Sequence, residues 1–84
     1  MKKKLITLAK ELDFETDVQY FEYIIESLIN GQRQQVRDLF NDLRKKDKAE
    51  FLNRYVDNYF VGYYSAEHLD QVREICINEI LLNI

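Results

Sequence analysis

The chain contains no proline and only two glycines, Gly31 and Gly62, in 84 residues. Proline and glycine are the residues that most often interrupt helices and form tight turns. The remaining apolar residues recur at spacings of three and four, and the strict alternation that is typical of strands is absent. The sequence therefore predicts helices throughout, with both glycines as left-handed C-caps, a conformation that costs glycine little.

The apolar spacing predicts a short helix near residues 3–12 and four longer helices. The longer ones are expected at 17–30, 32–46, 48–61 and 66–82. The short connections between them favour antiparallel neighbours. We predict an all-α fold with one domain over residues 1–84, a compact bundle of four main helices plus the short N-terminal helix.

Local signals mark three of the helix starts. Thr16 and Gln19 have the spacing of a capping box, in which two side chains satisfy backbone N–H groups at a helix start. Asp47 and Glu50 have the same spacing, which places a second start before residue 51. Ser65 precedes the last expected helix and is a favoured N-cap residue.

Two similar phrases, QVRDLF at residues 35–40 and QVREIC at residues 71–76, each follow a glycine by a few residues. A duplicated helical hairpin would explain them, and the bundle would then consist of two hairpins. Chance similarity between two amphipathic helices explains them equally well. Both alternatives therefore stay open.

Four of the six tyrosines lie in one stretch, YVDNYFVGYYS, at residues 55–65. Helical residues advance about 100° around the axis, so Tyr55 and Tyr59 share a face with Val56. We expect both rings in the core, and Phe60 at the edge of that face.

Four other tyrosine positions, two of them in that stretch, are candidates for binding a protein partner. Tyr63 and Tyr64 follow Gly62 and lie outside any helical face, although one of them could instead fold back over the end of the bundle. Tyr20 and Tyr23 point away from the apolar face of their own helix. Tyrosine is enriched at protein interfaces, which makes these positions the aromatic candidates.

The last helix is unusual because apolar residues spread around most of its circumference. An ordinary core stripe is expected from Leu69, Val72, Cys76 and Ile80. Ile77, Leu81 and Leu82 lie outside this stripe. Either the helix is central and buried on all sides, or its C-terminal half meets another chain, with a homodimer as one form of that contact.

Charge is segregated along the chain, which has a net charge of −3. Residues 11–27 carry six acids and no base. In the expected helix 32–46, Arg33, Arg37 and Arg44 fall within roughly 40° of one another. These arginines either pair with the acids of the preceding helix or form a stripe that binds an acidic protein or a nucleic acid.

No arrangement in the sequence indicates catalysis, a metal or a cofactor. The only histidine, His68, and the only cysteine, Cys76, are eight residues apart and face different sides of one expected helix. We therefore expect neither catalytic residues nor a metal site nor a bound cofactor, and we do not expect an enzyme. One cysteine and no long apolar run favour a cytoplasmic location without a membrane span.

A short sequence pattern within residues 23–56 resembles a pattern found in other proteins. Glu26, Ile29, Asn30 and Gly31, followed by polar residues and by Val36-Arg37, precede a lysine-rich turn and another helix. This pattern resembles small helical proteins encoded by bacteriophages and mobile elements of gut bacteria. The resemblance implies a non-enzymatic regulator or inhibitor in the cytoplasm of a bacterial host, which binds a larger protein such as a defence enzyme. A nucleic-acid-binding accessory protein is the alternative, through the three arginines.

Overall fold

The computed structural model describes residues 2–83, and every regular element among them is helical. The elements follow in the order α1 (Leu5–Glu11), α2 (Asp17–Ile29), α3 (Arg33–Asn41), α4 (Lys45–Glu50), the π-helix η1 (Phe51–Tyr59) and α5 (Ala66–Leu82). Since α4 runs into η1 without a break, the chain has four main helical segments and a short N-terminal one. The predicted all-α fold is confirmed.

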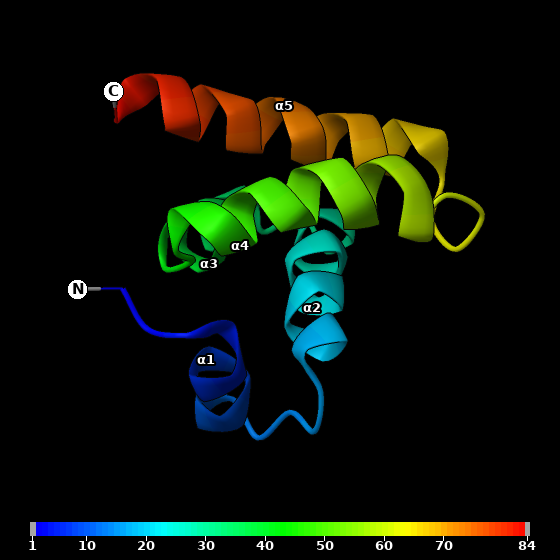
Figure 1. The fold of residues 1–84 in the computed structure, drawn as a ribbon. Coiled ribbons are helices and arrows are strands. Elements are labelled where there is room, and N and C mark those ends of the chain that lie inside the picture. Colours follow the sequence, from blue (N-terminus) through cyan, green and yellow to red (C-terminus); the bar gives the residue numbers. More distant parts are fainter. Residues whose placement is uncertain (1, 84) are drawn as a thin grey trace.

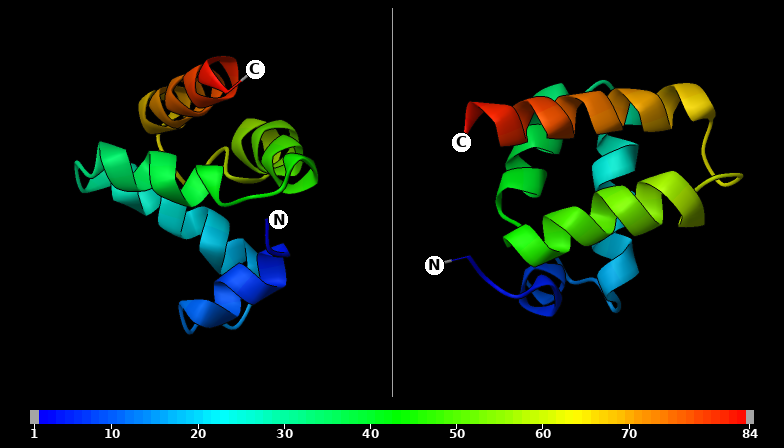
Figure 2. Two further views of the ribbon diagram at one scale, coloured as in Figure 1. Left: turned by 90° about the vertical axis from the view of Figure 1, so that its left-hand side faces the viewer. Right: turned by 45° about the horizontal axis from the view of Figure 1, so that its top comes forward.

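The helices are arranged with α1 and α5 on opposite sides of the molecule (Figure 1). α5 and the α4–η1 segment lie side by side and run in opposite directions, as both views in Figure 2 show. α2 crosses beneath them and packs against α3 and α5, while α1 packs against α2 on the side away from α5. This leaves one long side of α5 without a neighbouring helix.

The predicted caps are confirmed at two of three helix starts. The Oε1 atom of Gln19 accepts the Thr16 N–H at 3.0 Å, and the Ser65 Oγ accepts an N–H of the first turn of α5 at 3.2 Å. The capping box predicted for Asp47 and Glu50 is wrong, because α4 already begins two residues before Asp47.

Both glycines adopt positive φ angles, 77° at Gly31 and 96° at Gly62. The predicted left-handed C-cap is confirmed at Gly31, which directly follows the C-cap residue of α2. Gly62 instead lies two residues beyond Phe60, the C-cap residue of η1, in a turn that the Tyr63 N–H closes by donating to the Phe60 carbonyl at 3.0 Å. At the end of α2, the Gly31 N–H donates to the Leu28 carbonyl at 2.9 Å, and the Gln32 N–H donates to the Ser27 carbonyl at 2.8 Å. This pair of bonds is the Schellman motif, which satisfies carbonyls that a helix end leaves unpaired.

The helix expected over residues 32–46 is divided in two. α3 ends at Asn41, and Arg44 adopts an extended conformation with ψ 160° as the N-cap residue of α4. Between the helices, Leu43 turns inward and is fully buried. The bend is therefore stabilised by a tertiary contact, which local helix propensity does not reveal.

The π-helix η1 changes which aromatic residues are buried. Its backbone bonds span five residues, so that the Phe60 N–H donates to the Tyr55 carbonyl at 2.7 Å. In an α-helix, Phe51 and Phe60 would point in roughly opposite directions. The wider turn places both on the buried face with Val56, and all three are enclosed. Tyr59 is 49% exposed, so the prediction of a buried Tyr59 with Phe60 at the edge was wrong.

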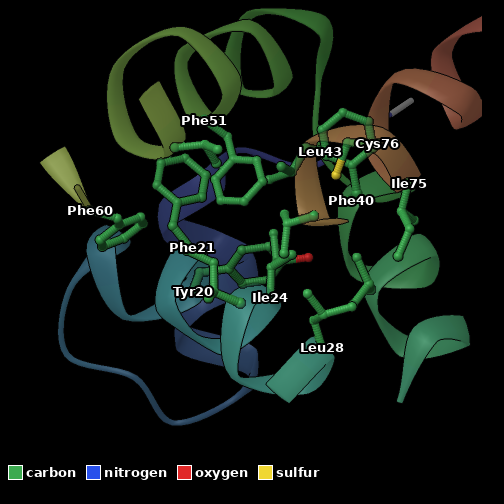
Figure 3. Packing of buried hydrophobic residues seen from close by; sticks show 14 of the residues in the cluster. Tyr20, Phe21, Ile24, Leu28, Phe40, Leu43, Phe51, Phe60, Ile75 and Cys76 are labelled. Carbon is green, nitrogen blue, oxygen red and sulfur yellow. The ribbon is translucent and has the colours of Figure 1, made fainter. Parts of the chain in front are cut away.

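Aromatic rings from α2, α3 and η1 meet at the centre of the core (Figure 3). The centroid of the Phe21 ring lies 5.0 Å from that of Phe51 and 4.7 Å from that of Tyr55. Phe40 approaches Phe51 from α3, with 6.2 Å between the ring centroids. Helices distant in sequence are thus joined by one aromatic cluster, and Cys76 of α5 is buried beside it.

Candidate functional site

The C-terminal half of α5 carries exposed apolar side chains that the rest of the described chain does not cover. We call Ile77, Ile80, Leu81 and Leu82 the α5 surface, in which Ile77 and Leu81 lie on the outer side of the helix and Ile80 and Leu82 lie on its two flanks. Leu81 is 61% exposed and Leu82 is 77% exposed. The alternative of a central helix buried on all sides is therefore wrong, and so is the expectation that Ile80 belongs to the core stripe.

A hollow of about 590 Å³ lies beside the α5 surface, between α4 and the end of α5. This α4–α5 hollow is lined by Lys45, Lys48, Ala49, Ile80 and Asn83. Burial lowers the pKa of Lys48, and the positive charge of Lys2 lowers it further. The hollow therefore combines an apolar wall with a positively charged rim.

The inner side of the same half-helix is held to α3 by polar contacts. The Asn41 Nδ2 donates to the Oε1 atom of Glu79 at 2.7 Å, and the Arg37 Nε lies 4.0 Å from the other carboxylate oxygen. Because Glu79 anchors this side, the α5 surface has a defined outward orientation. Sequence reasoning identified Ile77, Leu81 and Leu82, and it placed Lys45 and Lys48 in a positively charged stretch. It did not predict the hollow, because the bend after α3 determines where α4 lies.

The two tyrosines of α2 differ in burial. Tyr20 is buried, and its hydroxyl donates to the Leu39 carbonyl at 2.7 Å. Burial raises its pKa well above the ordinary range. The expectation that Tyr20 points to a partner was wrong, because α3 covers that side of α2 and offers a hydrogen-bond acceptor. Tyr23 is half-buried, with its ring in edge contact with Phe14 at 5.5 Å.

The two tyrosines after Gly62 also differ. Tyr63 is 74% exposed and its ring stacks on that of Tyr59, with 5.8 Å between the centroids. Tyr64 packs its ring edge-to-face on Phe60 and donates from its hydroxyl to the Oε2 atom of Glu26 at 3.4 Å. Tyr64 is thus the one that folds back over the end of the bundle, and Tyr63 stays at the surface.

The three arginines do not form one stripe on a helix. Arg33 and Arg37 lie on α3, but Arg44 lies beyond its end, where its Nε donates to Asp47 at 3.1 Å. The expected pairing with the acids of α2 was also wrong, since Arg37 contacts Glu79 of α5 instead. The nucleic-acid alternative therefore loses the continuous helical face on which it was based.

The only cysteine is a free, buried thiol. Burial raises the pKa of the Cys76 thiol to about 12. Within residues 2–83, no three His, Cys, Asp or Glu side chains are placed to hold a metal ion. None of the helices over the same residues has the length and apolar character needed to cross a lipid bilayer.

No protein-family model, curated protein or solved structure matches the chain. The likeness of residues 23–56 to phage and mobile-element proteins stays a prediction from the sequence.

Proposed function

We propose that the chain is a non-enzymatic protein-binding module, and that a larger partner protein covers the α5 surface. The observation that carries this proposal is the set of exposed apolar side chains on the C-terminal half of α5, of which Ile80 also lines the α4–α5 hollow. Exposed apolar patches next to charged rims are typical of protein-interaction sites. These side chains are not part of the buried core cluster, so core packing does not explain why they are apolar.

Charge favours a partner that presents an apolar ridge flanked by carboxylates. Lys45 and Lys48 line the hollow, and Lys46 is exposed beside them. In a symmetric dimer the surface of one copy meets the same surface of the other, so lysines that lie near the symmetry axis would repel one another. An acidic partner neutralises them instead, which favours a different protein over a second copy.

We further propose the setting that the resemblance implies. The chain would act in the cytoplasm of a bacterial host as a phage or mobile-element regulator or inhibitor of a larger protein, for example a defence enzyme. The support for this setting is the pattern within residues 23–56, which ends α2 in the Schellman turn at Gly31 and continues through α3.

Affinity capture with matched variants tests the binding surface. The test variant is Leu81→Ser/Leu82→Ser, and the control is Ile6→Ser/Ile29→Ser, which also replaces two exposed apolar residues but lies elsewhere. We expect wild type and control to capture one bacterial protein that the test variant loses. The purified pair should bind more weakly at high salt and after Lys45→Glu/Lys48→Glu.

Two results would contradict the proposed surface. One is capture of the same protein by the Leu81→Ser/Leu82→Ser variant with unchanged affinity. The other is light scattering that shows a stable wild-type dimer which the same double substitution converts to a monomer, because a second copy would then be the occupant.

A further inference from the structure

A second concave surface lies on the side of the molecule away from α5, between the α1–α2 connection and the outer face of α2. This α1–α2 groove has a volume of about 440 Å³ and is lined by Leu12, Phe14, Gln19, Glu22, Tyr23 and Glu26. Phe14 and Tyr23 form its aromatic wall, with an angle of 77° between the two rings. Both side chains are half-buried, so part of each ring remains open to the groove.

The carboxylates of this groove are not neutralised within the described chain. The ion pairs over residues 2–83 engage other acids, and none of them joins Glu22 or Glu26 to a base. Burial, then Glu26, then Glu22 raise the pKa of the neighbouring Tyr64 to about 12. The two carboxylates contribute less to this pKa shift than burial does, but unlike burial they would favour a cation.

We propose that the α1–α2 groove binds an arginine side chain presented by a basic segment of a partner protein. A guanidinium group is planar and stacks on aromatic rings, and its donors suit a carboxylate on either side. Glu22 and Glu26 are four residues apart on one face of α2, and Tyr23 lines the groove beside that face. Leu12 supplies apolar contact for the methylene stem of the arginine.

This groove is independent of the α5 surface and prefers the opposite charge. The lysine-rimmed hollow suits an acidic partner segment, whereas the α1–α2 groove suits a basic one. The two surfaces could therefore engage two regions of one protein, or two different proteins, without competing.

A peptide titration followed by amide NMR tests the groove without knowledge of the natural partner. The probe is acetyl-Ala-Arg-Leu-Arg-Ala-amide, and its matched control carries citrulline in place of both arginines. Citrulline keeps the shape of arginine but has no charge. We expect shifts concentrated at residues 14–26 with the arginine peptide, and at least about fivefold weaker binding of the citrulline peptide.

Protein variants locate the binding site. Glu22→Gln/Glu26→Gln should weaken the arginine peptide at least about fivefold, whereas Glu67→Gln/Glu74→Gln removes two exposed charges from α5 and should leave it unchanged. Leu81→Ser/Leu82→Ser should also bind the peptide like wild type, which separates failure of this groove from failure of the α5 surface.

Equal binding of the arginine and citrulline peptides would overturn the proposal, and this comparison needs only the wild-type protein. Shifts centred outside residues 14–26, or full affinity in a folded Glu22→Gln/Glu26→Gln variant, would overturn it as well.

Discussion

The second half of α5 is the more apolar of the two, yet its apolar side chains are the more exposed. In the first half, Leu69, Val72 and Ile75 are buried against the helices beneath. In the second half, Leu81 and Leu82 are exposed, and the inward contacts of that half include the polar anchor at Glu79. The contrast shows that apolar content alone does not report burial, because burial requires a neighbouring helix on each apolar side. It also distinguishes residues that build the fold from residues that remain for a partner.

A leucine-to-alanine substitution should destabilise the protein much more in the first half of α5 than in the second half, and this is the largest effect that we expect. Leu69→Ala removes a side chain that is 3% exposed and should lower the free energy of unfolding by about 2–5 kcal/mol. Leu82→Ala should change it by less than about 0.5 kcal/mol. Urea unfolding of both variants measures the difference, and equal destabilisation would mean that the second half is also part of the core.

Thiol labelling tests the boundary between the two halves. Cys76 is buried, and burial raises its pKa to about 12, so at pH 8 its thiol is protonated as well as inaccessible. The adjacent Ile77 is exposed. We expect Cys76→Ala/Ile77→Cys to be labelled at least about a hundredfold faster than wild type under native conditions. Comparable rates would place the boundary elsewhere.

A smaller loss of stability is expected when Glu79, the polar anchor on the inner side of the second half of α5, is replaced. Glu79→Ala removes the acceptor of Asn41 and the partner of Arg37, and should cost about 1–2 kcal/mol. Glu74→Ala on the exposed side of the same helix is the control, with a change within about 0.5 kcal/mol. Thermal melts that rank the two variants equally would show that Glu79 does not hold α5 to α3.

Features set by neighbouring residues in the chain could be predicted from the sequence. The helical class, the caps at Thr16 and Ser65 and the turns at Gly31 and Gly62 all depend on local backbone chemistry. Among the candidate site residues, the exposure of Leu81 and Leu82 was one of two alternatives that the apolar pattern left open.

Features set by tertiary packing could not be predicted in this way. Tyr20 looks exposed on the wheel of its own helix, yet α3 covers it and accepts its hydrogen bond. The inward turn at Leu43 removes Arg44 from the helix of the other two arginines. Phe60 is buried and Tyr59 is exposed, contrary to the prediction, because η1 does not have the α-helical period from which their faces were assigned.

Photo-crosslinking from position 82 tests most directly whether the α5 surface contacts another protein. A photoreactive phenylalanine derivative would replace Leu82, and in the control it would replace Ile6, which is exposed on α1. After irradiation of gut-bacterial cells that produce the chain, we expect an adduct with a larger protein from position 82 and no such adduct from position 6. The absence of an adduct from position 82, or an adduct with only a second copy of the chain, would contradict the proposed function.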